Sequence, residues 1–250
     1  MRYFLEVSYK GTRYSGFQIQ QTGSTIQGAI QKALSIFLKQ PLVLTGSSRT
    51  DSGVHAQQNF FHFDCVQSFD PNWIYNLNAI LPADIVIKNI FEVPPDAHSR
   101  FDAGSRSYQY NLYRFKNPFL ADTAYYFPYK LDEEELQTAA TLIKEYTDFT
   151  SFSKKNTQVK TCQCTIIESQ WGTTEYGLYY QVTANRFLRG MVRALVATML
   201  KVGRGRLSMD GFRQLLETPR FGAAFFDAPA HGLTLMKVNY PDDILLNVGF

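Results

Sequence analysis

The N-terminal part of the chain alternates apolar and polar positions and then changes to a helical period. Apolar residues at every second position between Tyr3 and Tyr9 predict a β-strand. A loop rich in Gly, Ser, Thr and Gln follows over residues 10–23, and Ser24-Thr25-Ile26-Gln27 has the spacing of a capping box that opens a helix. The apolar face of this helix consists of Ile26, Ile30, Ala33, Leu34, Phe37 and Leu38.

The rest of the chain continues this mixture of periods. Alternating aromatic residues predict a strand over residues 59–64, and Trp73, Leu77 and Ile80 predict a short helix that ends near Pro82. Further strands are expected at residues 85–93, 105–114, 160–170, 177–185 and 233–240. Further helices are expected at residues 132–146, 187–202 and 209–217.

The order of these elements indicates an α+β protein with two similar subdomains. Each half of the chain reads strand, helix, strand, with a helix before its closing strand, and Pro94-Pro95 ends the first half. We therefore expect two subdomains, each a mainly antiparallel sheet with helices on one face. The first spans residues 1–103, and the second spans residues 104–250 and includes a tyrosine-bearing strand and a basic helix.

The helix expected at residues 187–202 combines an apolar stripe with a row of arginines. The stripe consists of Leu188, Met191, Val192, Leu195 and Met199. Arg186, Arg189 and Arg193 lie beside it on a helical projection, so each would be partly desolvated and would need an anion. That anion could be a structural carboxylate, a phosphate or a catalytic carboxylate.

The net charge of +3 is too small to identify a partner, but its distribution is informative. No Asp or Glu occurs between Tyr176 and Met209, a segment that also contains Lys201, Arg204 and Arg206. A local basic zone on a nearly neutral protein is typical of a nucleic-acid-binding surface. A solvated helix face gives the same pattern, and charge alone does not separate the two.

The composition is typical of a globular protein of the reducing cytoplasm. Of the 250 residues, 45% are hydrophobic, which is ample for a core. The cysteines are odd in number, and the Cys-x-Cys at Cys162 and Cys164 has no second pair, so we expect neither disulfides nor a metal site. No apolar run approaches the ~18 residues of a membrane span, and the N-terminus has no apolar signal region.

The strongest candidate for chemistry is Asp51, within Ser48-Arg49-Thr50-Asp51-Ser52-Gly53-Val54-His55-Ala56. Arg49 lies two residues before it, so the carboxylate should stay ionised and oriented. Such a carboxylate can act as nucleophile, general base or metal ligand. A lone Asp-x-Gly is more often an Asx turn, so the assignment depends on the rest of the chain.

Several short motifs occur in a fixed order along nearly the whole chain. They are Tyr9-Lys10-Gly11-Thr12, Gly16-Phe17-Gln18-Ile19-Gln20, Arg49 to Ala56, Asn78-Ala79-Ile80-Leu81-Pro82 with Asp84-Ile85, Ser105-Arg106-Ser107-Tyr108-Gln109-Tyr110, Asp148-Phe149-Thr150-Ser151-Phe152, Asn185 with Phe187 and Met191-Val192-Arg193, and Gly232-Leu233 with Leu235. In this order they resemble the tRNA pseudouridine synthase A family. The chain departs from that family's usual residues at Lys10, Phe17, Ser48 and Lys160-Thr161-Cys162, which affects loop geometry only.

The resemblance implies the pseudouridine synthase fold and isomerisation of uridine to pseudouridine at positions 38–40 of the tRNA anticodon arm, without a cofactor. Asp51 would be the catalytic carboxylate and would either attack C1′ or remove the C2′ proton. Arg193 would pair with Asp51, and Arg49 would fill the space left by the flipped base or hold the backbone. Tyr108 would stack on the base, and Leu233 would form an apolar wall.

The resemblance also implies a homodimer and a tRNA-binding surface. The phosphate contacts are assigned to Arg186, Arg189, Lys201, Arg204 and Arg206. Two other classes of function fit parts of the sequence: an RNA-binding module or chaperone of the same fold without turnover, and a metal-dependent nuclease that uses Asp51 and His55. The intact set of Asp51, Tyr108 and Arg193 argues against the first class. No further carboxylates near Asp51 in the sequence support the second, and His55 is expected to bond locally.

Overall fold

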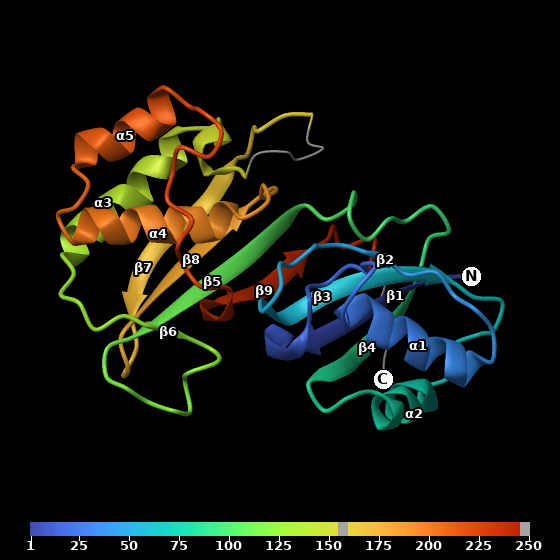
Figure 1. Ribbon diagram of the computed structural model, residues 1–250. Helices are drawn as coiled ribbons and strands as arrows, with labels where there is room; N and C mark the ends of the chain where they lie inside the picture. The colour runs from blue at the N-terminus through green and yellow to red at the C-terminus, as the bar shows by residue number, and fades with distance from the viewer. Residues whose placement is uncertain (155–159, 246–250) are drawn as a thin grey trace. The chain divides into compact units, whose positions relative to one another are not determined.

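The computed structural model describes residues 1–154 and 160–245, which divide into two compact units (Figure 1). Unit 1 comprises Met1–Gly104 and the segment that begins at Thr234, and unit 2 comprises Ser105–Leu233. The first boundary falls after Gly104, one residue from the expected position. The C-terminal segment differs more: we expected it in the second subdomain, and it belongs to unit 1 because its strand pairs with a strand of that unit.

Unit 1 is built on a mainly antiparallel sheet. Its strands are β1 (Arg2–Tyr9), β2 (Thr45–Gly46), β3 (His55–Asp64), β4 (Ile85–Val93) and β9 (Leu233–Asn239). β1 lies between β3 and β4 and is antiparallel to both, while β9 pairs parallel with β3. Phe4 and Leu5 are adjacent in β1 and both fully buried, so the alternation in the sequence described one of two buried faces.

The two helices of unit 1, α1 (Ile26–Leu38) and α2 (Asn72–Ile80), cover one face of this sheet (Figure 1). Trp73 of α2 contacts the ring of Tyr3, with centroids 6.5 Å apart. The opposite face packs against Tyr240, whose ring centroid lies 5.3 Å from that of Phe4. Burial on both sides is what makes β1 rich in apolar residues at consecutive positions.

The N-terminus of α1 is capped one residue later than the sequence indicated. The Thr25 hydroxyl accepts a hydrogen bond from the Gly28 amide, so Thr25 is the N-cap. Gln27, the expected far member of a capping box, accepts from the Ile19 amide and donates to the Leu44 carbonyl instead. The capping-box assignment was therefore wrong, and Gln27 ties α1 to the loops before and after it.

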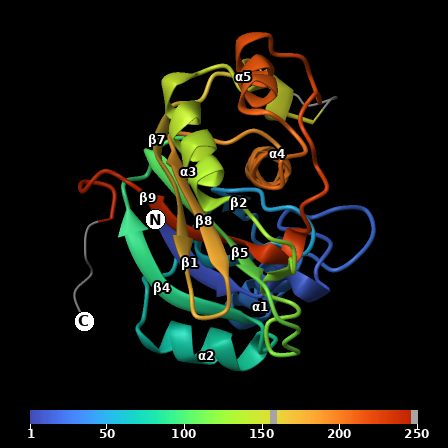
Figure 2. The same cartoon turned by 90° about the vertical axis from the view of Figure 1, so that its left-hand side faces the viewer.

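The main strands of unit 2 are antiparallel, and its helices lie on one face of them (Figure 1). The strands are β5 (Ser105–Tyr113), β6 (Tyr125–Tyr126), β7 (Ile166–Thr173) and β8 (Leu178–Ala184). β8 lies between β5 and β7, antiparallel to both, and β6 pairs parallel with the end of β5. The helices are α3 (Glu133–Leu142), α4 (Met191–Gly203) and α5 (Met209–Glu217) (Figures 1 and 2). The core between sheet and helices includes Tyr180, Val182 and Met199, each fully buried.

Short 3-10 helices occupy four connections among the described residues. They are η1 (Gly11–Arg13), η2 (Ile143–Glu145), η3 (Thr150–Phe152) and η4 (Ala230–Gly232). The α+β class is confirmed, whereas the prediction of one separate sheet for each subdomain was wrong, because the described strands belong to a single large, mostly antiparallel sheet. The helix predicted at residues 209–217 and the strand predicted at residues 85–93 have the same bounds in the structure.

The strand expected at residues 160–170 is displaced along the chain. β7 begins at Ile166, because the residues before it bond to a neighbouring stretch of loop and not to β8. The Cys164 amide donates to the Thr147 carbonyl, and the Phe149 amide donates to the Cys162 carbonyl.

α4 begins later than the sequence indicated. Gly190, the residue just before it, has a φ of +75°, in the left-handed region that interrupts a right-handed helix. Arg186 and Arg189 therefore precede the helix, and Arg193 lies on it. The prediction of a row of three arginines on one helix was wrong, whereas the stripe from Met191 onward is buried as expected.

Candidate active site

Asp51 lies in the connection between β2 and β3 of unit 1. Its side chain is half-buried, between the exposed Arg49 and the buried Val54. The Val54 amide donates a 3.2 Å hydrogen bond to the Asp51 carbonyl, which closes a tight turn. Gly53 has a φ of +80° in this turn, a conformation in which a residue with a Cβ would be strained. The turn places one partly exposed carboxylate at the start of a rigid strand.

A buried polar network holds the residues on both sides of Arg49. The hydroxyls of Tyr9 and Thr50 lie 2.8 Å apart, and the side-chain amide of Asn59 donates to the Tyr9 hydroxyl at 3.1 Å. The same amide donates to the Ser48 carbonyl at 2.9 Å. Burial raises the pKa of Tyr9 to about 12, so its hydroxyl stays protonated at neutral pH. Sheet residues thus anchor the loop immediately before the candidate carboxylate.

The N-terminal loop packs against the same connection. The Phe17 amide donates to the Thr50 carbonyl at 3.1 Å, and the Ser52 hydroxyl donates to the Tyr14 carbonyl at 3.0 Å. A Cβ on Gly16, which has a φ of +109°, would lie 3.3 Å from the Thr50 carbonyl oxygen. The glycine-rich loop of residues 10–23, called here the clamp, therefore packs against the turn that contains Asp51 and restrains it.

His55 bonds locally, as expected from the sequence, and its partner is a residue of this N-terminal loop. Its Nδ1 accepts a 3.0 Å hydrogen bond from the Gly11 amide, so that nitrogen carries no proton. A Cβ on Gly11 would lie 2.0 Å from the Val54 carbonyl oxygen, so the backbone at this position must be glycine. His55 and Gly11 together fix the start of β3.

Tyr9, Asn59 and Asp84 were not predicted as parts of the site. Asp84 accepts hydrogen bonds from Tyr14 at 2.7 Å and from Arg13 at 2.8 Å, which ties down the clamp. Burial raises the pKa of Asp84, but these two donors outweigh that effect and hold it below its usual range. The Asp84-Ile85 dipeptide was a signal for this residue, since it was part of the motif series.

In unit 2, Tyr108 lies on β5 opposite Val182 of β8. Its ring is half-buried and packs edge-on against Phe187, with centroids 5.1 Å apart. Tyr110, two residues further along the same face, is fully buried and donates to the Pro229 carbonyl at 2.8 Å. Tyr110 is therefore a core residue, whereas Tyr108 keeps part of its ring exposed.

Arg193 lies in the first turn of α4 and is half-buried. Its Nε donates a 2.8 Å hydrogen bond to the Ala228 carbonyl, which fixes the plane of the guanidinium group. Leu233, at the start of β9, is buried. Arg49 and Asp51 share one loop of unit 1, whereas Tyr108, Arg193 and Leu233 belong to unit 2.

The other cations that the sequence singled out are placed differently from one another. Arg189 and Arg206 are exposed, and Arg186 is half-buried. Lys201 forms a 2.9 Å ion pair with Asp227, and Arg204 stacks on Tyr129 at 3.8 Å from the ring centroid. The last two are oriented by protein groups, which reduces the entropy lost when an anion binds.

Within residues 1–154 and 160–245, no group of three or more His, Cys, Asp or Glu side chains is arranged to hold a metal ion. In the same ranges, no helix has the length and apolar character needed to cross a membrane.

Comparison with known proteins gives consistent matches. The family model described as tRNA pseudouridine synthase matches residues 6–102 and 146–241. The chain is 42% identical over 246 residues to "tRNA pseudouridine synthase A" of Parabacteroides distasonis, covering 97% of each chain. It is 43% identical over 247 residues to the protein of that name from Bacteroides thetaiotaomicron, covering 97% of this chain and 92% of the relative. The Staphylococcus saprophyticus protein of the same name is 38% identical, over 100% of this chain and 95% of its own. The chain belongs to the tRNA pseudouridine synthase family.

Proposed function

We propose that this protein converts uridine to pseudouridine at positions 38–40 of the tRNA anticodon stem-loop, with Asp51 as the catalytic carboxylate. Membership of the family supports an isomerase that acts on tRNA. The choice of Asp51 rests on how its loop is held. Thr50 and Ser48 are hydrogen-bonded to residues of β-strands, while Asp51 itself is partly exposed. Hydrogen bonds of this kind orient a carboxylate without burying it.

The reaction exchanges one bond between base and sugar for another. The C1′–N1 bond breaks, uracil rotates, and a C1′–C5 bond forms; C5 loses its proton to solvent and N1 gains one. Positive charge develops at C1′ during cleavage, as in glycoside hydrolysis, and a nearby carboxylate stabilises it. Asp51 either forms a covalent bond to C1′ or removes the C2′ proton, and both routes release uracil within the site.

The other site residues have supporting roles in this proposal. A base inside a stacked stem must first be flipped out, and Arg49, exposed beside Asp51, occupies the vacated space or holds the backbone. Arg193 is assigned as the cation that pairs with the Asp51 carboxylate, and the orientation of its guanidinium by the Ala228 carbonyl supports that role. The partly exposed ring of Tyr108 stacks on the flipped base, and Leu233 forms an apolar wall of the pocket.

Binding of the tRNA is assigned to the phosphate contacts of the cations in unit 2. They are Arg186, Arg189, Lys201, Arg204 and Arg206. Contacts of this kind give salt-dependent recognition of RNA shape. The reaction as written has no step for a metal or redox cofactor, and we propose that the enzyme acts as a homodimer in the cytoplasm.

The proposal is tested by release of tritium from a tRNA transcript that carries [5-³H]uridine. The purified protein is incubated with the transcript in EDTA, beside a matched transcript with cytidine at positions 38–40. Tritium release from the first transcript and none from the second is the expected result. Equal release from both would overturn the site assignment. Binding of the tRNA with no release from either would favour the alternative, a binding module or chaperone without turnover.

A further inference from the structure

Two phenylalanine side chains of unit 2 stand out in solvent on a single loop. Phe115 is 82% exposed and Phe119 is 89% exposed, and both lie between β5 and β6. Single exposed apolar residues are common on protein surfaces and need no explanation. Two large exposed rings four positions apart on one short loop are the kind of apolar surface that marks an interaction site.

The backbone of this loop is held by its own hydrogen bonds. The Leu120 amide donates to the Asn117 carbonyl, and the Ala124 amide donates to the Leu120 carbonyl at 2.9 Å. The Asn117 side chain also accepts from the Phe119 amide at 3.0 Å. The two rings are therefore carried on an ordered turn.

One end of the loop is hydrogen-bonded to the turn between β7 and β8, and the other end to β5. The Arg114 amide donates to the Tyr176 carbonyl, and the Phe127 amide donates to the Tyr113 carbonyl at 2.8 Å. The loop runs out from the end of β5 and returns to β6, which pairs with β5 (Figure 1). An element fixed at both ends loses little entropy when its exposed rings bind a partner.

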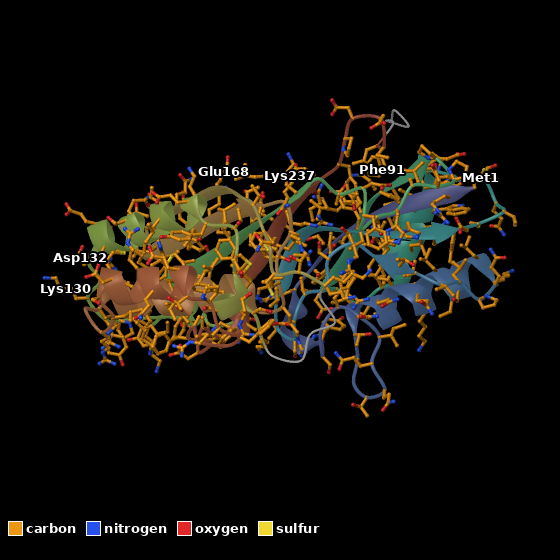
Figure 3. All side chains as sticks on the ribbon, turned by 90° about the horizontal axis from the view of Figure 1, so that it is seen from above. Met1, Phe91, Lys130, Asp132, Glu168 and Lys237 are labelled. Atoms are coloured by element: carbon orange, nitrogen blue, oxygen red, sulfur yellow. The ribbon has the colours of Figure 1, made fainter. Side chains whose placement is uncertain are left out.

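One exposed cation lies on the same loop as the exposed rings, and others follow β6 along the chain. Lys116 lies between them in sequence and is exposed. Lys130, which follows β6, is also exposed and points away from the unit (Figure 3). Tyr129 beside it is half exposed and carries Arg204 on its face at 3.8 Å. Exposed aromatic rings interleaved with cations are typical of surfaces that bind single-stranded nucleic acid, because bases stack on rings and phosphates bind cations.

We propose that the loop of residues 114–124, called here the aromatic loop, is a second contact for the tRNA. In this contact, Phe115 and Phe119 stack on unpaired bases and Lys116 binds the adjoining phosphate. The inference rests on the proposed function, since it takes tRNA as the substrate. It adds a binding element outside the residues assigned there to catalysis and to phosphate contacts.

The test compares variants that separate stacking from apolar contact. Three double substitutions and one single control are compared with the wild type by fluorescence anisotropy on a labelled tRNA transcript. The double substitutions are Phe115→Ala with Phe119→Ala, Phe115→Leu with Phe119→Leu, and Phe115→Trp with Phe119→Trp, and the control is Tyr75→Ala. Tyr75, on α2 and 77% exposed, is a matched control outside the loop. We expect Kd to rise at least about tenfold for the Ala and Leu pairs. The Trp pair and Tyr75→Ala should bind as the wild type does.

Two results would overturn this inference. One is binding by the Ala pair within twofold of the wild type. The other is a loss of self-association by the Ala pair in analytical ultracentrifugation, together with tRNA binding that returns when the protein concentration is raised. The loop would then be an interface between copies of the chain. Tritium release distinguishes the failure of this inference from the failure of the proposed function. If the wild type releases tritium and the Ala pair has an unchanged KM, the aromatic loop is rejected as a tRNA contact and the proposed function stands. A wild type without tRNA binding or release rejects the proposed function itself.

Discussion

The Tyr9 hydroxyl lies 2.8 Å from the hydroxyl of Thr50, the residue before Asp51. Tyr9 is at the end of β1, and Asn59 of β3 completes the contact with a 3.1 Å hydrogen bond to the same oxygen. The position of the candidate carboxylate is thereby coupled to the pairing of two strands in the middle of a sheet. Such coupling is a means of preorganising a catalytic loop.

Replacing Tyr9 with phenylalanine removes the shared hydroxyl and leaves Thr50 and Asn59 with an unsatisfied buried group. We expect a loss of about 1–3 kcal/mol in the free energy of unfolding, measured by urea denaturation. We also expect kcat to fall with little change in KM, because the loop loses its orientation and not its surface. The control is Tyr180→Phe, which removes a 2.8 Å hydrogen bond between the buried Tyr180 and Ser169 hydroxyls. A control that lost as much kcat as Tyr9→Phe would contradict the coupling.

Gly16 holds the clamp against the catalytic loop. Gly16→Ala introduces strain at a φ of +109° and brings a Cβ to 3.3 Å from the Thr50 carbonyl oxygen. The matched control is Gly205→Ala, where φ is +66° and no atom among those described lies within 4 Å of the added Cβ. Each change should cost about 1–2 kcal/mol of stability from the left-handed backbone. We expect a further loss of kcat for Gly16→Ala alone, and equal kcat in the two variants would show that the clamp has no catalytic effect.

The stability of unit 1 should depend on pH through His62. Its Nδ1 accepts from the Ser99 amide and lies 2.9 Å from the Ser99 hydroxyl. Burial chiefly lowers the pKa of His62 to about 4, helped by the nearby His98 and Arg2 and opposed by Asp64 and Asp102.

Because the unfolded chain binds a proton near pH 6.5 and the folded protein near pH 4, stability is lost as pH falls between these values. Between pH 7.5 and 5.5 we expect a decrease of about 1 kcal/mol in the free energy of unfolding. His62→Gln should reduce that decrease, and an unchanged pH dependence in this variant would assign it to other groups.

The exposed cations of unit 2 should set the salt dependence of tRNA binding. Arg189→Ala and Arg206→Ala each remove one proposed phosphate contact, so each should lower the slope of log K against log salt by about 1. Lys32→Ala, an exposed cation on α1, is the control and should leave the slope unchanged. A slope that did not change in either arginine variant would remove these residues from the RNA-binding surface.

The parts of the fold that follow from local chemistry were predictable from the sequence. The strand at residues 85–93 is followed by two prolines, and the helix at residues 209–217 follows the Ser208 side chain, which caps it by accepting from the Gly211 amide. The start of α4 was not predictable in the same way, because Gly190 stands inside an apolar periodicity that continues on both sides. Its left-handed conformation is a property of the folded chain.

The sequence predicted the motif that contains the candidate carboxylate, but it did not predict the residues that hold this motif in place. The residues around Asp51 made it a candidate carboxylate, and its assignment depended on the ordered motifs along the rest of the chain. The side chains of Tyr9 and Asn59 meet because of the register in which β1 and β3 pair. This register shifts between Val7 and Tyr9, next to the hydrogen bond between Asn59 and the Tyr9 hydroxyl. Register between strands separated by a helix and two loops is a tertiary property.

The catalytic role of Asp51 is tested by single-turnover tritium release with the variants Asp51→Ala and Asp51→Asn, with tRNA affinity measured on the same samples. Asp64→Ala is the matched control, since Asp64 is an exposed carboxylate of the same unit, paired with Arg2. We expect tRNA binding by all variants, full release by Asp64→Ala and no release by either Asp51 variant. Tritium release at the wild-type rate by Asp51→Ala would contradict the catalytic role of Asp51.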